Sequence, residues 1–248
     1  MLHPASNTLL KALSDDARNE LSTSLVPVAL PRSMVLYEAN QIPHYAYFPT
    51  SGMASVVANT PAGQCAEVGL IGREGVTAAL HLLGSAPVVS QCFVQVEGSA
   101  LRVPFTALRK AFDHSASVRG AVLAFVQGQS VVLEQLGACN LFHPADARLA
   151  RWLLMVQDRV STDMVDLTQE FLSVMLGSGR PTVTLACGAL QKAGAIDYRR
   201  GHIQILSREK LQESACDCYG VAAASFLAVG HSITRGGNIR YQAEAAAT

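Results

Sequence analysis

Hydrogen-bonding side chains gather in the stretch MLGSGRPTVT (175–184), between two segments that both have helical periodicity. Arg180, Thr182 and Thr184 would lie in the first turns of the second helix, on the face opposite its apolar residues. A guanidinium can donate two hydrogen bonds to O6 and N7 of guanine, and threonine hydroxyls can contact base edges or phosphates. This is the chemistry of reading nucleic acid, provided that the neighbouring elements can place the helix in a groove.

The Gly-Ser-Gly segment predicts a sharp corner rather than a loop. Thr168 or Asp166 can cap the helix before it. Gly177 lies where the chain must leave that helix, and a positive φ costs glycine little. Pro181 suits the first turn of the next helix, where its missing N–H would be unpaired anyway. Two short helices joined by a three-residue turn form a helix-turn-helix, which can bind DNA or be purely structural.

The segment IDYRRGHIQI (196–205) reads as a strand-turn-strand wing directly after the second helix. Its Arg199 and Arg200 are placed to contact phosphates. Residues 176–210 hold six basic and two acidic residues, while the whole chain has 19 of each and no net charge. A local basic excess can be only a solvated face, but next to a helix-turn-helix it favours DNA binding.

The cysteines are scattered, and none forms a Cys-x-x-Cys pair, so neither a disulfide framework nor a zinc module is predicted. They are Cys65, Cys92, Cys139, Cys187, Cys216 and Cys218. Thiols in a reducing cytosol fit this pattern best. The pair in CDC (216–218) can bind a soft metal, but two ligands do not make a site, and the alternative is a packed helix end. We therefore expect no metal site.

Length and composition limit the fold that must position these groups. The chain has 248 residues, of which 50% are hydrophobic and 15% are charged, enough for one large domain or two ordinary ones with a sizeable core. No stretch approaches the roughly 18 uninterrupted apolar residues of a membrane span. The start lacks a basic region followed by an apolar one, so no export signal is predicted. We expect a cytoplasmic protein without a membrane partner.

The period of the sequence changes twice along the chain. Residues 1–24 read as short helices, and short runs rich in Val, Tyr and Phe then follow up to Pro104, separated by turn formers. These runs predict a compact β-barrel or sandwich, with one short helix at 75–84. Helical periodicity returns after Pro104, including an amphipathic helix over 141–160.

The segment 116–139 predicts one long helix with a heptad seam of apolar residues around a single glutamine. The seam positions are Val118, Val122, Phe125, Gln129, Val132 and Leu136, with Cys139 as its last member. Two interpretations stay open. The seam can pack on the chain's own domain, or it can be shared with a second copy of the chain.

Together these elements resemble the Crp/Fnr superfamily of bacterial transcription regulators over roughly residues 10–218. Residues 167–206 resemble its winged helix-turn-helix, and LYEANQIPHYAYFPTSGMASVV and EVGLIGREG resemble strands of its cyclic-nucleotide-binding β-roll. The resemblance implies an α+β fold and a homodimer on a palindromic operator. Its implied parts are a sensory roll with N-terminal helices (1–115), a dimerisation helix (116–139) and a DNA-binding domain (140–220). The small, Ala-rich tail that follows (221–248) is expected to be poorly ordered at its end.

The sensory part departs from the pattern of members that read cyclic AMP. Those members carry an Arg-Ser pair after the short helix of the roll, and here Val88 and Val89 precede Ser90 instead. An anionic phosphate would lack a paired cation, so we expect no useful cyclic AMP binding. Arg73 and Glu74 read as a structural turn or ion pair. The candidate effector pocket comprises Gly72, Arg73, Glu74, Gly75, Val88, Val89 and Ser90.

No cofactor is expected. The N-terminal cysteine group of iron–sulfur members is missing, and lone histidines such as His44 or His81 are more often surface or hydrogen-bonded core residues than haem ligands. No GxSxG, HExxH, P-loop or GxGxxG motif occurs, and His143 and His202 have no nucleophilic partner in the sequence, so an enzyme is not predicted.

In the helix that would enter the groove, Arg180 matches the family's guanine-reading arginine, but Pro181 and Leu185 replace its acidic residue and its second arginine. The family's usual DNA code is therefore not carried over. The expected DNA contacts are Thr168, Gln169, Arg180, Pro181, Thr182, Thr184, Leu185, Arg199 and Arg200. The expected partners are double-stranded DNA and a second copy of the chain, and the resemblance also allows RNA polymerase and a small-molecule effector. An effector-sensing or adaptor protein with a weakened DNA-binding face is the alternative.

Overall fold

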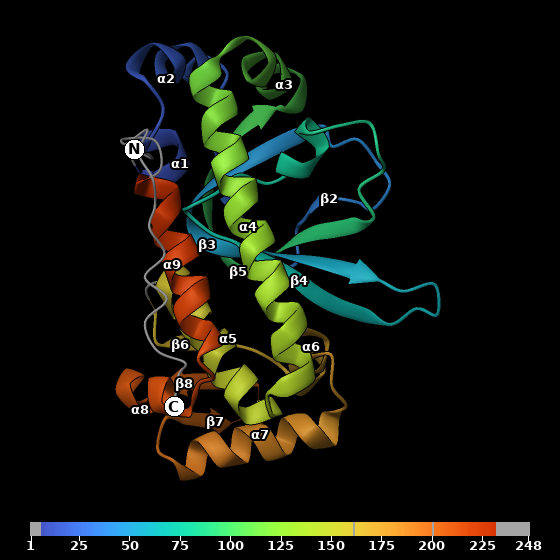
Figure 1. Cartoon of the computed structure of the whole chain (residues 1–248), viewed down its shortest axis with the longest axis vertical. Helices are drawn as coiled ribbons and strands as arrows, with labels where there is room; N and C mark the ends of the chain where they lie inside the picture. Colours follow the sequence, from blue (N-terminus) through green and yellow to red (C-terminus); the bar gives the residue numbers. More distant parts are fainter. Residues whose placement is uncertain (1–5, 161, 200, 232–248) are drawn as a thin grey trace, which may run out of the picture.

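The computed structural model describes residues 6–160, 162–199 and 201–231, with two parts stacked along the long axis of the molecule (Figure 1). The first part holds the longer strands and the N-terminal helices, and the second is a winged helix-turn-helix. The long helix α4 (Ala116–Phe142) runs beside both (Figure 1). The expected α+β fold is confirmed.

The N-terminal helices α1 (Thr8–Lys11) and α2 (Asp15–Ser22) are fastened to the first part by a buried asparagine. Asn7 accepts a hydrogen bond from the Leu10 N–H at 3.0 Å and so caps α1. Its amide donates to the carbonyls of Pro49 and Gly75, both at 2.9 Å. One side chain therefore satisfies a helix end and two further backbone carbonyls that would otherwise be buried without partners.

The first part is an antiparallel sheet rolled around an apolar core. Its strands are β1 (Val26–Leu30), β2 (Val35–Tyr37), β3 (Tyr45–Asn59), β4 (Cys65–Ile71) and β5 (Ser90–Pro104). They run in the order β1-β5-β3-β4, and β2 also pairs with β5. The long β3–β5 pair shifts register between Pro49 and Ala54, where the strands bend. Glycine is required there, because a Cβ on Gly98 would lie 2.3 Å from the Ser51 carbonyl oxygen.

The short helix expected at 75–84 is only the 3₁₀ helix η2 (Ala79–Leu82). The preceding residue, Ala78, has a left-handed backbone with φ of 63°, which prevents a continuous α-helix. Gly75 passes so close to α4 that a Cβ would lie 2.2 Å from the Phe125 ring. This segment is therefore shaped by its packing against α4 and not by helix propensity.

After β5 the chain forms α3 (Phe105–His114), α4 and α5 (Ala145–Val160). The helix α4 extends three residues beyond the expected end at 139, and the chain turns at Pro144 into α5. Two apolar cores meet along α4. Val118, Val122 and Phe125 belong to the core of the roll, and Val132 belongs to the core of the second part.

The second part contains β6 (Met164–Asp166), α6 (Gln169–Leu176), α7 (Arg180–Lys192), β7 (Ile196–Arg199), β8 (His202–Ile205) and α8 (Arg208–Ser214). The strands form a small antiparallel sheet in the order β6-β8-β7. The expected hairpin thus gains a third strand from the segment before α6. That segment carried no strand signal of its own, because only three residues pair.

The last described helix, α9 (Cys218–His231), includes the beginning of the segment expected to be a tail (221–248). Residues 221–231 are helical and pack along α4, as Figure 1 shows. Small residues such as Ala222, which is buried, favour helix and allow close approach. Residues 232–248 of the expected tail lie outside the described part of the chain.

Buried polar contacts join the roll to the second part. Arg159 of α5 donates from Nε to Glu74 at 2.8 Å, and both side chains are buried. Glu67 of β4 accepts from Trp152 Nε1 and from Ser55 Oγ, each at 2.6 Å. Removing one partner of a buried pair leaves an uncompensated charge, at a cost of about 3–5 kcal/mol. These contacts therefore fix how the two parts meet.

Glu67 predicts a pH dependence of stability. Burial raises the pKa of Glu67 from 4.5 to about 7, although the hydrogen bonds from Ser55 and Trp152 favour the carboxylate. The folded state then holds this proton more tightly than the unfolded state, so the group's contribution to stability falls as pH rises from 4.5 to about 7. One proton gives a slope of at most about 1.4 kcal/mol per pH unit.

Glu67→Gln should remove this slope while keeping an acceptor for Trp152. Urea unfolding across the range in which Glu67 titrates measures it. We expect the variant to gain free energy of unfolding over the wild type steadily as the pH rises. Parallel pH profiles for the two proteins would contradict the assignment.

Candidate functional site

The corner between α6 and α7 has the geometry that its glycines predict. Thr168 caps α6 by accepting from the Phe171 N–H at 3.2 Å, so Thr168 rather than Asp166 is the cap. Gly177 ends α6 with φ of 55°, in the left-handed region that favours glycine. Gly179 precedes α7 without a side-chain cap, and Pro181 occupies its first turn. The first N–H groups of α7 are therefore not satisfied by a capping side chain, as an anion-binding helix end requires.

One face of α7 is buried and the opposite face is exposed. Val183, Ala186 and Leu190 pack inward, in the core that α7 shares with α5 and α6. The five residues of this helix expected to contact DNA are all exposed on its outer side: Arg180, Pro181, Thr182, Thr184 and Leu185. In Figure 1, α7 lies at the lower end of the molecule.

Arg180 is held by a neighbour that sequence reasoning did not identify. Its Nη2 lies 3.2 Å from Glu170 Oε2, and both side chains are mostly exposed. An exposed ion pair of this kind contributes about 0–1 kcal/mol to stability. It therefore orients the guanidinium but is weak enough for the guanidinium to exchange Glu170 for another partner. Thr184 donates its hydroxyl proton to the Arg180 carbonyl at 3.0 Å, which leaves its oxygen as an acceptor. The sequence feature that could have identified Glu170 as a partner of Arg180 is its place in the first turn of α6.

Of the two wing arginines expected to contact phosphates, the structure describes Arg199. Arg199 is exposed at the end of β7 and pairs with Asp197 at 3.1 Å. Arg200 lies outside the described residues. Gly201 turns the hairpin with φ of 85°, and His202 Nδ1 lies 2.6 Å from Asp166 Oδ1 on β6. Of the other expected contacts, Thr168 is exposed but occupied as a cap, and Gln169 is half-buried.

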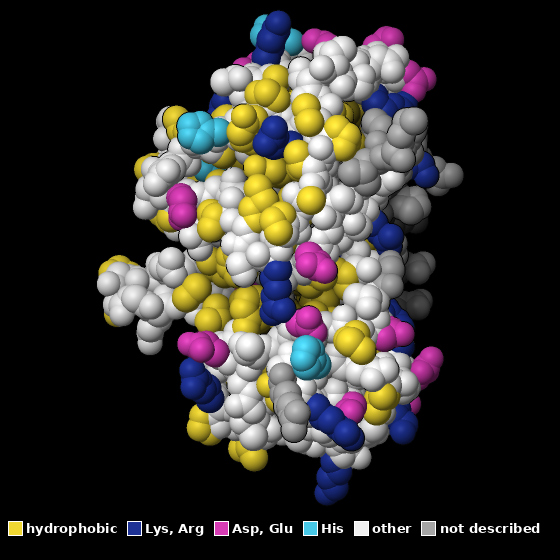
Figure 2. Space-filling model, turned by 180° about the vertical axis from the view of Figure 1, so that it is seen from behind, with side chains coloured by type: hydrophobic (Ala, Val, Ile, Leu, Met, Phe, Trp, Pro, Cys, Tyr) yellow, Lys and Arg dark blue, Asp and Glu magenta, His cyan; other side chains and the backbone are white. Residues whose placement is uncertain are grey.

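The surface charge is mixed around this site. On the face shown in Figure 2, Lys and Arg side chains at the lower end of the molecule are interspersed with Asp and Glu side chains. The ion pairs Arg180–Glu170 and Arg199–Asp197 follow the same pattern. A polyanion would compete with these carboxylates for the two arginines. Nucleic acid bound here would have to replace Glu170 and Asp197 as the partners of Arg180 and Arg199.

A second candidate site is a cavity of about 130 Å³ between the roll and α4. Its walls are mostly apolar, with a few polar groups from β2, β5 and α4. It is lined by Tyr37, Val56, Val68, Gly69, Ile71, Val76, Ala78, Ala79, Leu80, Ser90, Phe125, Val126, Gln129, Ser130 and Leu133. Among these described residues there is neither arginine nor lysine.

Of the seven residues expected to form the effector pocket, Ser90 lines this cavity. Gly72, Arg73, Glu74, Gly75, Val88 and Val89 do not line it. The physical reason is that their segment is used to join the two parts. Glu74 pairs with Arg159, and Arg73 donates from Nη2 to the Asp158 carbonyl at 3.3 Å. Sequence position alone could not show that this turn faces α5 and not the cavity.

Polar groups in the cavity are neutral. Burial raises the pKa of Tyr37 far above its ordinary value, so its phenol stays protonated. Gln129 donates from its amide to the Leu70 carbonyl at 2.9 Å. Ser90 and Ser130 add hydroxyls. Such a lining suits a small, uncharged ligand or simple packing better than an anion.

The heptad seam of α4 packs on the chain's own fold, which is the first of the two interpretations that the sequence left open. Val118, Val122, Phe125 and Val132 are buried, Gln129 bonds to β4, and Leu136 packs on the second core. The adjacent stripe, one residue further along, faces outward: Leu123, half-buried Val126, Ser130, Leu133 and Gly137. The exposed Leu141 extends this face at the end of the helix. Both stripes repeat at the same spacing, so periodicity could not choose between them.

The exposed stripe makes α4 unusually apolar for a surface helix. By length and composition alone α4 is long and apolar enough to cross a membrane, and only 28% of its most apolar window is buried in the chain. Leu123 and Leu133 are 46% and 48% exposed, and Leu141 is 80% exposed. A contiguous apolar face of this kind indicates a surface that is covered in the working molecule.

Comparisons with known proteins agree with this architecture. A family model for the cyclic nucleotide-binding domain matches residues 27–115, and a model for the Crp-like helix-turn-helix domain matches residues 147–214. No curated protein matches the chain.

Three solved structures share the fold at low sequence identity. A protein from Eubacterium rectale, assigned to the crp/fnr family of transcriptional regulators, has 16% identity and a TM-score of 0.67, covering 85% of this chain and 98% of its own. FixK2 from Bradyrhizobium japonicum has 18% identity and a TM-score of 0.64, covering 77% and 98%. The c-di-GMP-responsive regulator CLP from Xanthomonas campestris has 13% identity and a TM-score of 0.63, covering 78% and 100%.

Proposed function

The chain belongs to the Crp/Fnr family of transcription regulators, and on that basis we propose that it acts as a homodimer on a palindromic operator. The family and its structural neighbours are regulators and not enzymes. We place the protein in the cytoplasm, with its DNA. Contacts with RNA polymerase and with a small-molecule effector stay predictions from the resemblance.

The observation that carries the proposal is the exposed face of α7. Arg180 and the threonine oxygens lie at its N-terminal end, which is the part of a recognition helix that meets base edges in the major groove. The exposed Leu185 can contact a thymine methyl group but cannot donate to guanine. Direct readout therefore rests mainly on one arginine in each half-site.

The second part of the proposal concerns the dimer surface. We assign it to the outward stripe of α4, which includes Leu123 and Leu133, together with Leu141, in place of the buried seam. Two copies of this stripe can pack side by side, because its positions repeat every three or four residues. Gly137 and Ser130 are small enough for the helices to approach closely.

Arg180 can be tested on duplexes selected from a random library. Arg180→Ala should cost roughly 1–3 kcal/mol of binding free energy and relax the preference at one position in each half-site. Arg199→Ala is the matched control, since a phosphate contact should weaken binding to all sequences and reduce the salt slope by about one. Fluorescence anisotropy at several salt concentrations measures both effects.

If Arg180→Ala left both affinity and base preference unchanged, α7 would not be the reading helix. An absence of selected sequences for the wild type would instead favour the alternative, an effector-sensing or adaptor protein with a weakened DNA-binding face.

Two neighbouring residues separate the two stripes of α4. Leu133→Asp should split the dimer while leaving the monomer folded, because Leu133 is 48% exposed in the chain. Val132→Ala should keep the dimer but lower the free energy of unfolding by about 1–2 kcal/mol, because Val132 is buried in the second core. Sedimentation and urea unfolding report the two quantities. A wild type that is monomeric at micromolar concentration would contradict the proposed dimer.

The cavity should not bind cyclic nucleotides usefully. A cyclic phosphate is a permanent anion, and a missing charge-assisted partner costs on the order of 2–5 kcal/mol, or about 30-fold to several thousand-fold in affinity. Isothermal titration with cyclic AMP and cyclic GMP should show no saturable heat at micromolar concentrations. A dissociation constant in the low micromolar range would overturn this reading of the cavity.

A further inference from the structure

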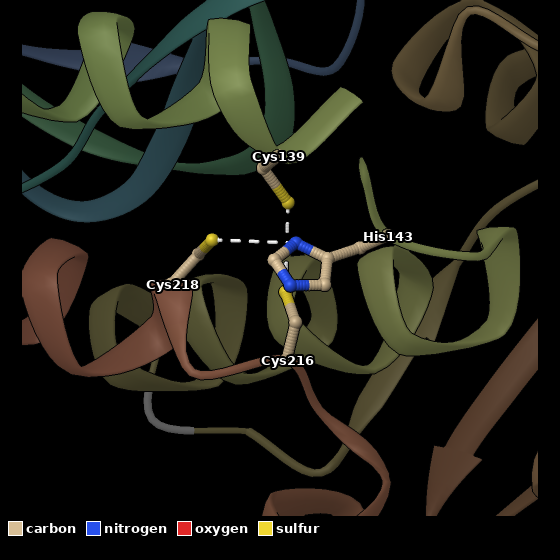
Figure 3. Close-up of side chains that lie close together, drawn as sticks. All are labelled: Cys139, His143, Cys216 and Cys218. Carbon is tan, nitrogen blue, oxygen red and sulfur yellow. Dashed lines mark hydrogen bonds between the residues drawn. The ribbon is translucent and has the colours of Figure 1, made fainter. Parts of the chain in front are cut away.

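Four soft-metal ligands from distant parts of the sequence converge at the end of α4 (Figure 3). Cys139, His143, Cys216 and Cys218 point toward one another, and their ligand atoms all lie within 4.8 Å of one another. The Sγ atoms of Cys139 and Cys216 are 3.5 Å apart, and Cys218 Sγ lies 3.5 Å from His143 Nδ1. The fold thus brings Cys139 and His143 to Cys216 and Cys218. Four ligands lie together where the sequence alone indicated two.

Two local spacings present the ligands in pairs. Cys139 and His143 are four residues apart at the last turn and cap of α4, so they lie on one side of the helix. Cys216 precedes α9, and Cys218 is its first residue. The packing of α9 along α4 brings the pairs together.

We propose that these four residues form a structural Zn²⁺ site. Three thiolates and one imidazole are an established donor set for tetrahedral zinc. A Zn–S distance of about 2.3 Å places tetrahedral donors about 3.8 Å apart. The two donor separations of 3.5 Å are close to that value, so an ion can enter with small side-chain adjustments. On binding, each thiol and any imidazolium releases its proton to solvent as a metal bond forms.

Groups around the ligands are arranged as supports for a metal. His143 Nε2 lies 3.4 Å from Asp217 Oδ1, and the Cys218 thiol donates to the same oxygen at 3.8 Å. A proton on Nε2 leaves the lone pair of Nδ1 directed at the site, which is how outer carboxylates orient metal-binding histidines. Gln135 donates from Nε2 to Cys218 Sγ at 3.1 Å. Such a hydrogen bond stabilises a thiolate.

A buried arginine supplies an independent observation. Arg151 of α5 is 4% exposed; among the described residues its Nε has no hydrogen-bond partner, and its Nη1 donates only to the sulfur of Met155. Arg151 lies one turn after Ala147 on α5, and the Ala147 carbonyl accepts from the Cys216 N–H at 3.5 Å. Three thiolates around Zn²⁺ carry one net negative charge. The occupied site would therefore give this buried cation a counter-charge.

The position of the site indicates its role. Cys139 and His143 lie just before Pro144, where the chain passes from the long helix into the DNA-binding part. Cys216 and Cys218 lie just after that part, where α9 turns back toward the roll. A bound ion would hold the entry and exit of the winged helix together. We therefore expect zinc to stabilise the docking of α9 on α4.

The test uses the full chain under reducing conditions, after a chelator has removed any bound metal. The protein is then titrated with Co²⁺ and afterwards with Zn²⁺. We expect one Co²⁺ per chain, with thiolate-to-cobalt charge-transfer absorption and the intense visible bands of tetrahedral Co²⁺. Zn²⁺ should abolish these bands, remain bound at one ion per chain by elemental analysis, and raise the melting temperature.

Variants show which residues hold the ion. Cys218→Ser should weaken Co²⁺ and Zn²⁺ at least tenfold and reduce the charge-transfer band. Asp217→Asn should weaken Zn²⁺ by roughly 10–100-fold yet keep the tetrahedral spectrum, as expected for an orienting carboxylate. Because Asp217 is 91% exposed, this variant should fold normally. Cys65→Ser, a cysteine on β4 outside the cluster, is the matched control and should bind as the wild type does.

The proposal is overturned if the reduced wild type gives no thiolate charge-transfer band. It is also overturned if Cys65→Ser weakens binding as much as Cys218→Ser, or if Asp217→Asn has no effect and Zn²⁺ does not change the melting temperature. A Cys139–Cys216 disulfide that persists in reductant would exclude the site as well. None of these outcomes depends on DNA binding.

Discussion

The packing of one helix on two cores is the constraint on which the rest of the structure depends. One side of α4 buries Val118, Val122 and Phe125 in the roll and Val132 in the winged-helix part. The same helix forms a wall of the cavity and receives α9 along its length. Any shift of α4 would therefore change the packing of both cores, the shape of the cavity and the positions of Cys139 and His143 in the cysteine cluster. Its outward stripe is left as the surface with which a second copy can pair.

Buried polar contacts add direction to this apolar packing. The Glu74–Arg159 pair and the Trp152–Glu67 hydrogen bond link strands and turns of the roll to α5, the first helix of the second part. Apolar surfaces alone tolerate sliding, whereas a buried charge must keep its partner. These polar contacts, together with the apolar core that Met53, Val57 and Leu70 of the roll share with α5, hold the second part against the roll. The cavity between the roll and α4 is lined in part by Gly69 and Ile71 of β4, the strand that carries Glu67.

Local signals predicted much of this molecule. Gly177, Pro181 and the Thr168 cap identified the helix-turn-helix corner, and the turn formers identified the strands of the roll, because both follow from backbone preferences of single residues. The sequence could not predict which of the two stripes of α4 is buried, because both repeat with the same period. The ion pair of Glu74 was expected but its partner Arg159 was not, and the cysteine cluster was not predicted, because each depends on a partner about 75–85 residues away. Long-range pairing of this kind leaves no pattern in a single sequence.

The most direct test of the proposed function is selection of bound duplexes from a random-sequence library by the full chain. The account predicts an enriched palindrome whose half-sites lie about one helical turn apart, roughly 10 base pairs or a multiple of that spacing, with a preferred guanine in each half. This symmetry would follow from two copies related through α4. Enrichment of a single, non-repeated half-site, or no enrichment at all, would contradict a dimeric reader of DNA.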